Sequence, residues 1–219
     1  MSDILRPIVT DEDRFVRCGD RDEILARGWS HRTVWGMVFS PNTAQWLVQL
    51  RREDKAICPG LWDMSCAGHV DCVDGQPEPY ADAYAREMTE ELGLRAQFLP
   101  YFDVADSHQH GSRVRVSAAS PLVPTVSLGH SREYHRLATS YGERLVKEHV
   151  GMFLSICDDA VALVPGGEPQ ALAWMSTEAI RRRLIATGST TPGLALMLDR
   201  CGEHLSSLGL SHVRPATES

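Results

Sequence analysis

The sequence predicts an α/β protein in which a mixed β-sheet packs against helices. Runs rich in β-branched and aromatic residues occur in both halves of the chain, and turn-forming residues separate them. A segment with apolar residues at helical spacing lies between these runs, and a second helical pattern follows near the end of the sequence. Strands and helices in this order are typical of an α/β fold.

The first predicted strands cover residues 33–40 and 46–51, which read TVWGMVFS and WLVQLR. The turn-forming segment PNTA at residues 41–44 separates them, so we expect the pair to form a hairpin. A further short strand is predicted near residues 65–70, after a loop that contains proline and glycine.

The strongest helix signal covers about residues 79–92. Pro79 suits the first turn of a helix because proline has no backbone N–H, and Gly93 suits the end because glycine adopts the left-handed conformation readily. The predicted apolar stripe of this helix consists of Ala81, Ala85, Met88 and Leu92.

Two more strands are predicted at residues 96–104 and 144–156, on either side of an irregular stretch at about 105–140. This stretch is too long for a simple connection. It is interpreted as either a substrate-shaping insertion or a mobile loop, with room for a short strand at residues 113–117.

Helices are predicted for the last part of the chain. One starts with a cap at Ser176 or Thr177, and another at about residues 191–208 opens with Thr191 and Pro192. The apolar side of the last helix is formed by Leu194, Met197, Leu198, Cys201 and Leu205.

No repeat, low-complexity tract or linker divides the sequence, so we expect residues 1–219 to form a single domain. The net charge of -7 argues against sequence-independent nucleic-acid binding, which depends on clustered Lys and Arg. There is no signal-like N-terminus and no apolar run of spanning length, so we expect no membrane contact and a cytoplasmic protein.

The cysteines are scattered without a pairing rhythm or a CxxC motif. In a reducing compartment this pattern predicts free thiols, and Cys66 and Cys72 are interpreted as small packing residues. The full set is Cys18, Cys58, Cys66, Cys72, Cys157 and Cys201.

The candidate chemistry lies in the segment REMTEELGL. On a helix, Glu87, Glu90 and Glu91 are at positions i, i+3 and i+4, so their carboxylates project from one face. A cluster of carboxylates suits a hard cation such as Mg²⁺ or Mn²⁺. The alternative is a solvated acidic face on which Arg86 pairs with Glu90.

The segment from Arg86 to Leu94 resembles the C-terminal half of the Nudix box, and Glu78 stands at the required seven-residue spacing before Arg86. The front of the box departs from the family pattern, because nine residues instead of five separate Gly68 from Glu78. About four extra residues therefore lie around positions 73–76, where Asp74 and Gly75 favour a turn. Asp74 is a rival to Glu78 for the upstream acidic role.

The resemblance implies an α/β/α sandwich and Mg²⁺- or Mn²⁺-dependent hydrolysis of a small-molecule diphosphate, and it is compatible with a homodimer. It implies the catalytic residues Glu90, Glu91 and Arg86, and structural support from Glu78 and Gly93. The implied metal ligands are Glu87, Glu90, Glu91, the Gly68 carbonyl and, as an additional downstream carboxylate, Glu148.

The flanking segments resemble the branch of the superfamily that contains type 1 isopentenyl diphosphate isomerases. By this resemblance His31 and His69 match metal-binding histidines of those isomerases, and Arg51 and Lys55 match positions that contact the diphosphate, so we assign all four to the substrate-binding region. Each also has a purely structural interpretation, as a cap, a half-buried imidazole or hairpin charge. Isomerase activity is therefore the second hypothesis.

Two changes oppose the isomerase hypothesis. The isomerase cysteine position before Gly68 is Ala67, with Cys66 facing the other side of the strand, and the Glu-Asn-Glu pattern is replaced by Lys147-Glu148-His149. A third hypothesis is a Nudix module that senses a nucleotide derivative without turnover, which the retained glutamates disfavour.

Overall fold

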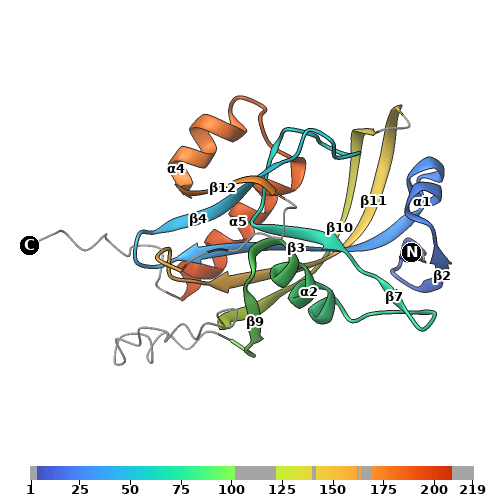
Figure 1. Cartoon of the computed structure of the whole chain (residues 1–219), viewed down its shortest axis with the longest axis horizontal. Coiled ribbons are helices and arrows are strands. Elements are labelled where there is room, and N and C mark those ends of the chain that lie inside the picture. Colours follow the sequence, from blue (N-terminus) through green and yellow to red (C-terminus); the bar gives the residue numbers. More distant parts are fainter. Residues whose placement is uncertain (1–3, 102–121, 140–141, 162, 164–168, 209–219) are drawn as a thin grey trace, which may run out of the picture.

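A computed structural model describes residues 4–101, 122–139, 142–161, 163 and 169–208 (Figure 1). Its strands are β1 (Arg6–Val9), β2 (Phe15–Gly19), β3 (Ser30–Ser40), β4 (Gln45–Arg51), β5 (Trp62–Asp63), β6 (Cys66–His69), β7 (Cys72–Val73), β8 (Gln76–Pro77), β9 (Arg95–Phe98), β10 (Leu122–Thr139), β11 (Gly142–Ile156) and β12 (Pro169–Ser176). Its helices are α1 (Arg21–Arg27), α2 (Tyr80–Leu92), α4 (Thr177–Ala179), the π-helical segment η1 (Ile180–Ile185) and α5 (Pro192–Ser207). Within the described ranges, every helix is too short or too polar to cross a membrane.

The main sheet contains parallel and antiparallel pairs and has the strand order β12-β4-β3-β11-β10-β9. β3 runs parallel to β11 along one edge, and its other edge pairs antiparallel with β4 and β6. The predicted hairpin is confirmed as β3 and β4, and the short strand near residues 65–70 is confirmed as β6. The sheet is mixed, as predicted.

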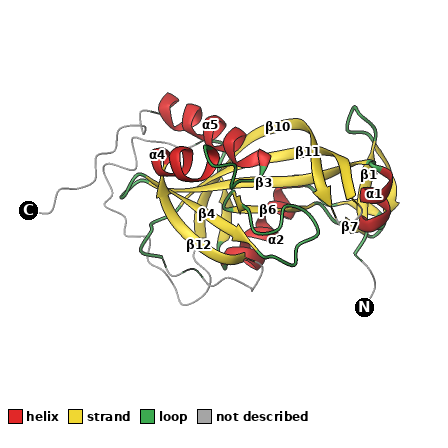
Figure 2. Cartoon of the chain, turned by 90° about the horizontal axis from the view of Figure 1, so that it is seen from above, coloured by secondary structure: helices red, strands yellow, loops and turns green. Residues whose placement is uncertain are grey.

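Helices cover both faces of this sheet, as Figure 2 shows, with α4 and α5 on one side and α2 on the other. All five apolar residues predicted for the last helix are buried in the core between α5 and the sheet. On the opposite face, Tyr84 of α2 stacks on Phe153 of β11 with 4.5 Å between ring centroids. The three layers confirm the α/β/α sandwich.

The helix α2 begins at Tyr80, with Pro79 in the cap position, and ends at Gly93. Gly93 has a φ of 69°, which glycine adopts without a steric penalty, so the predicted end of the helix is confirmed. The buried stripe runs through Ala83, Tyr84, Met88 and Leu92. The predicted stripe was therefore right at Met88 and Leu92. It was wrong at Ala81 and Ala85, which are half-buried, because the helix face that carries Tyr84 packs against the sheet.

The stretch predicted to be irregular is a strand over much of its length. β10 pairs antiparallel with β11 from Thr125 to Thr139, so the prediction of a loop was wrong for residues 122–139. Cross-strand pairing with the apolar β11 decides the conformation of this polar segment. The strand predicted at residues 96–104 begins as β9 and ends at Phe98, and the possible strand at 113–117 lies outside the described residues.

The extra residues before Glu78 form a small hairpin. β7 pairs antiparallel with β8, and the turn between them contains Asp74 and Gly75, with φ values of 51° and 74°. Positive φ at both turn positions is the backbone of a tight hairpin turn, so the turn prediction is confirmed. Asp74 is exposed at the tip, away from the segment that enters α2.

The prediction that every cysteine is a free thiol was wrong. Cys18 of β2 and Cys72 of β7 form a disulfide between Cα atoms that are 6.2 Å apart, at a sequence separation of 54. The sequence shows no pairing rhythm because strand packing, rather than a local motif, brings the two cysteines together. Cys58, Cys66, Cys157 and Cys201 are free thiols, as predicted.

Candidate active site

A cavity of about 590 Å³ lies at the junction of α2, β6, β3, β11 and the start of α5. Of the residues predicted for the site, nine line this cavity, and only His31, Glu78 and Gly93 do not. The nine are Arg51, Lys55, Gly68, His69, Arg86, Glu87, Glu90, Glu91 and Glu148. Trp35, Met64, Leu137 and Val146 add apolar surface to the same cavity.

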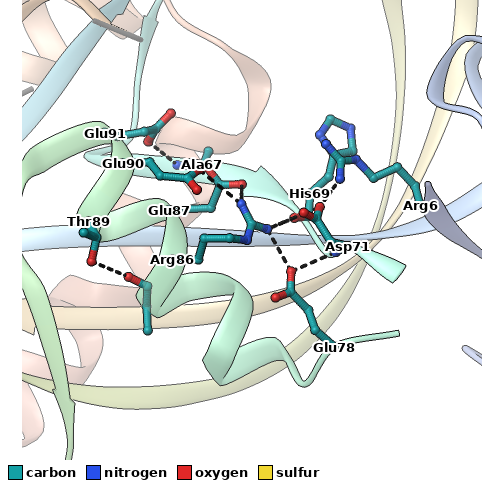
Figure 3. Close-up of polar contacts among 11 residues, drawn as sticks. Arg6, Ala67, His69, Asp71, Glu78, Arg86, Glu87, Thr89, Glu90 and Glu91 are labelled. Carbon is teal, nitrogen blue, oxygen red and sulfur yellow. Dashed lines mark hydrogen bonds and ion pairs between the residues drawn. The ribbon is translucent and has the colours of Figure 1, made fainter. Parts of the chain in front are cut away.

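Arg86 is the centre of the polar network in Figure 3. Its Nη2 donates to Glu78 Oε1 and to the His69 carbonyl oxygen, both at 2.8 Å. Its Nη1 donates to Glu87 Oε1 at 2.8 Å and to Glu90 Oε2 at 3.3 Å. One guanidinium group therefore joins the loop before α2, the strand β6 and two of the helix glutamates.

Glu91 is the most buried of the helix glutamates, with 7% of its surface exposed. Its Oε2 accepts hydrogen bonds from the Ala67 backbone N–H at 3.0 Å and from Gln49 Nε2 at 3.2 Å. Burial, together with the charge of Glu87, raises the pKa of Glu91 to about 8. In this environment the carboxyl group holds a proton near neutral pH unless a cation stabilises its ionised form.

Gly68 allows Glu87 to approach β6 closely. A Cβ atom at position 68 would lie 2.0 Å from the Glu87 carboxyl group, so no other residue fits there without displacing the glutamate. Burial raises the pKa of Glu87 as well. The peptide of Gly68 and the Glu87 carboxylate thus lie side by side at the cavity wall.

These oxygens fit a hard divalent cation. Glu87 and Glu91 are sequestered from solvent and have raised pKa values, a costly arrangement for two carboxylates that a cation would relieve. Among the described residues, no three His, Cys, Asp or Glu side chains are already gathered as a complete ligand group. Mg²⁺ tolerates such a partial set because it retains several waters and also takes substrate oxygens as ligands.

Glu148 also lines the cavity and lies beside two stacked imidazoles. His31 and His69 have ring centroids 5.4 Å apart, and His31 Nε2 lies 3.9 Å from Glu148 Oε1. Burial lowers the pKa of His31 to about 4 and that of His69 well below its usual value, so both rings are neutral at pH 7. Burial, and next the charge of Asp63, raises the pKa of Glu148 to about 7.

Arg51 lines the cavity, but its guanidinium group is bound to Asp63 and to carbonyl oxygens of the loop after β4. Its Nη1 donates to Asp63 Oδ2 at 2.9 Å, and its Nη2 donates to the Ile57 carbonyl oxygen, also at 2.9 Å. Its Nε bonds to the carbonyl oxygens of Ile57 and Cys58. Arg51 therefore shapes the loop that carries Lys55, which is half-buried at the cavity wall.

Four polar residues of this region were not predicted from the sequence. Gln49 bonds to Glu91, and Asp63 binds Arg51 and accepts a hydrogen bond from Thr191 at 2.6 Å. Asp71 pairs with both Arg6 and Arg86. Gln49 and Asp63 lie on strands, where the alternation of side chains does not show which polar residue binds which partner. Arg6 could not be predicted because it is 65 residues from Asp71 in the sequence.

Comparison with known proteins gives matches over part of the chain. An uncharacterized Nudix hydrolase of Pseudomonas aeruginosa is 38% identical over 87 residues, which cover 40% of this chain and 48% of the relative. An isopentenyl-diphosphate delta-isomerase of Pectobacterium atrosepticum is 30% identical over 95 residues, which cover 43% and 50%. The chain thus spans about half the length of these curated relatives.

Two solved structures share the fold. A crystal structure from Deinococcus radiodurans superposes with a TM-score of 0.60 at 18% identity, covering 90% of this chain and 98% of that chain. The NUDIX domain of Shewanella oneidensis NrtR, complexed with ADP ribose, has a TM-score of 0.50 at 13% identity, covering 79% and 86%.

The family itself follows from a match over most of the chain. The family model of the NUDIX domain matches residues 29–192, a range that contains α2, the hairpin before it and nearly all of the main sheet. Together with the α/β/α layers and the Arg86 network, this match shows that the chain belongs to the Nudix family.

Proposed function

We propose that this protein is a Mg²⁺- or Mn²⁺-dependent hydrolase that cleaves a diphosphate linkage in a small molecule, such as a nucleoside diphosphate derivative. The observation that carries the proposal is the convergence of Glu87, Glu90 and Glu91 on one cavity, with Arg86 between them and Gly68 against Glu87. A structural acidic face has no need for glutamates as little exposed as Glu87 and Glu91 at a cavity wall.

The residues that would hold the cation are Glu87, Glu90, Glu91, the Gly68 carbonyl and Glu148. When bound, the cation supplies neutralisation of phosphate charge and activation of a water molecule. One of Glu90 and Glu91 would accept the proton of the attacking water. Arg86 would position Glu87 and Glu90 through the bonds that it donates to both.

The remaining polar residues would bind the diphosphate. Lys55 and His69 line the cavity directly, whereas Arg51 would act mainly through the loop that it holds. His31 would support His69 by stacking. The apolar wall that includes Trp35 and Val146 would contact the group attached to the diphosphate.

Isomerisation of isopentenyl diphosphate is the second candidate, because two of the similar curated proteins are isomerases and Glu148 faces the cavity with a raised pKa. The surroundings of Ala67 oppose it. Ala67 lines the cavity and has no ionisable side chain, and Cys66 is fully buried in the core beneath α2.

A substrate screen tests the proposal. The protein would be incubated with a panel of nucleoside diphosphate derivatives and with isopentenyl diphosphate, in Mg²⁺, Mn²⁺ or EDTA, and the products identified. We expect metal-dependent phosphate or nucleotide release. Formation of the dimethylallyl isomer would favour the isomerase, and no turnover of any compound would favour a binding module.

Two variants and a control then locate the chemistry. Glu90→Gln and Glu91→Gln should each abolish metal-dependent release. Glu178→Gln is the matched control, because Glu178 makes a similar i,i+4 pair with Arg182 on the exposed surface, far in sequence from α2. A Glu91→Gln protein that retains full activity would contradict the assignment.

A further inference from the structure

The disulfide lies next to the site without being part of it. Cys72 belongs to the β7–β8 hairpin, the insertion that departs from the family pattern, and Cys18 belongs to β2, outside the family match at residues 29–192. Both figures of the whole chain place α1 and β7 at the same end of the molecule (Figures 1 and 2). Both cysteines are half-buried and belong to neither core cluster.

The hairpin is closed by residues that also hold Arg86. The Asp71 N–H donates to Glu78 Oε1 at 2.8 Å, and the Glu78 N–H donates to the Asp71 carbonyl oxygen at 2.9 Å. Glu78 Oε1 also accepts from Arg86, and Asp71 Oδ1 lies 3.4 Å from the Arg86 Nη2 atom. A displacement of the hairpin base would therefore move two of the groups that orient Arg86.

Residues of the N-terminal segment also bind the base of the hairpin. Arg6 of β1 binds the Asp71 carboxylate, as Figure 3 shows, and the Cys72 N–H donates to the Leu5 carbonyl oxygen at 2.8 Å. β1 pairs with β2, and there Pro7 lies opposite Cys18. The disulfide thus ties the strand beside Arg6 to the residue that follows Asp71.

Polar contacts also hold this end of the molecule: Arg6 binds Asp71, and Arg32 of β3 binds Asp13 in the turn between β1 and β2. In the described part of the chain, β1 joins β3 at a single register pair, Ile8 with His31. The nearby apolar side chains Val16 and Val73 are more than half exposed, at 57% and 55%, so they contribute little burial. The disulfide therefore adds a covalent restraint between β2 and the hairpin to these polar contacts.

We propose that Cys18–Cys72 is a redox-controlled latch, a thiol–disulfide exchange site that fixes Asp71 and Glu78 and through them positions Arg86. A dithiol reductant opens it: one thiolate attacks a sulfur of the bond, a mixed disulfide forms, and the second thiol of the reductant resolves it. The products are two protein thiols and the oxidised reductant. The effect on turnover rests on the proposed hydrolase function, whereas the effect on the hairpin and on cation binding does not.

The test compares the oxidised protein with the same protein after dithiothreitol treatment. We expect faster amide hydrogen exchange in residues 71–79, weaker binding of Mn²⁺ measured by electron paramagnetic resonance, and turnover lower by about ten-fold, the size expected when one hydrogen bond to a charged group is lost. Cys18→Ser/Cys72→Ser should match the reduced protein and no longer respond to the reductant. Cys58→Ser should keep the response, because Cys58 is a free thiol.

A merely structural disulfide is distinguished by Glu78, whose side chain joins the Asp71 N–H to Arg86. In Glu78→Ala, reduction should still speed exchange but should change Mn²⁺ binding and turnover less than in the unmodified protein, because this connection has been removed. Unchanged exchange on reduction overturns the proposal, and so does faster exchange with unchanged Mn²⁺ affinity. If neither redox form hydrolyses any substrate, the proposed hydrolase function is refuted. Amide exchange and Mn²⁺ affinity then still test whether the disulfide acts as a latch.

Discussion

Glu78→Gln is the change that tests the Arg86 network most directly. The Glu78 side chain is 11% exposed, and its Oε1 accepts charge-assisted bonds from Arg86 at 2.8 Å and from the Asp71 N–H at 2.8 Å. Replacing the carboxylate with an amide removes the charge from both interactions. Hydrogen bonds to charged groups contribute about 1.5–3 kcal/mol each, so we expect a loss of about 2 kcal/mol in the free energy of unfolding.

The same change should reduce catalysis because Arg86 loses one of its anchors. Misplacement of a positioning group by a fraction of an ångström to 1 Å lowers rates by about 10- to 100-fold, so kcat should fall within that range while KM changes less. Urea unfolding in EDTA measures the stability, and metal-dependent product release measures the rate.

Asp74→Asn provides the matched control, because Asp74 stands at the five-residue spacing after Gly68 and competes with Glu78 for the same role. Asp74 is exposed at the hairpin tip, where a substitution changes stability by at most about 0.5 kcal/mol. We expect its activity to equal that of the unmodified protein. A larger loss of activity in Asp74→Asn than in Glu78→Gln would refute the assignment of the upstream acidic role to Glu78.

Three further outcomes are expected. The pKa of His31 is about 4 in the folded protein, below its ordinary value of 6.5, so the contribution of His31 to folding stability should be full above pH 6.5 and fall by about 3 kcal/mol toward pH 4; the difference between His31→Gln and the unmodified protein in urea titrations measures this contribution. The pKa of Glu91 is about 8, so Mg²⁺ binding at pH 7 should release a proton and tighten as pH rises toward 8; calorimetry in buffers of different ionisation enthalpy measures the release, and its absence would contradict a ligand role for Glu91. Gly68→Ala should displace Glu87 and weaken Mg²⁺ binding, whereas wild-type affinity in this variant would show that the close approach is unimportant.

The helix and its glutamates could be predicted because their signal is local. Spacings of three and four residues determine which side chains share a helix face, and a glycine in the left-handed conformation marks the end of the helix at Gly93. The spacing from Glu78 to Arg86 spans the first turns of the same helix, so it also translates directly into a contact, the 2.8 Å bond between the two side chains.

The remaining features depend on contacts between distant segments. Arg6 meets Asp71 and Cys18 meets Cys72 only after β1 and β2 fold against the hairpin, and no spacing in the sequence indicates this. The polar strand β10 likewise has no apolar alternation of its own, and its register is set by β11. Residues that join a site through long-range packing therefore escape a motif-based prediction.

The alternation of side chains along β6 bears on the choice between hydrolysis and isomerisation. Cys66 points into the core beneath α2, where burial, and next the charges of Glu91 and Glu87, raise the pKa of its thiol well above the usual value. Such a thiol neither reaches the cavity nor ionises near neutral pH. The next residue, Ala67, faces the cavity, and its backbone N–H is bound to Glu91. At the position where an isomerase would present a cysteine, this chain has Ala67, whose N–H binds the Glu91 carboxylate, and this arrangement favours the proposed metal-dependent hydrolysis over isomerisation.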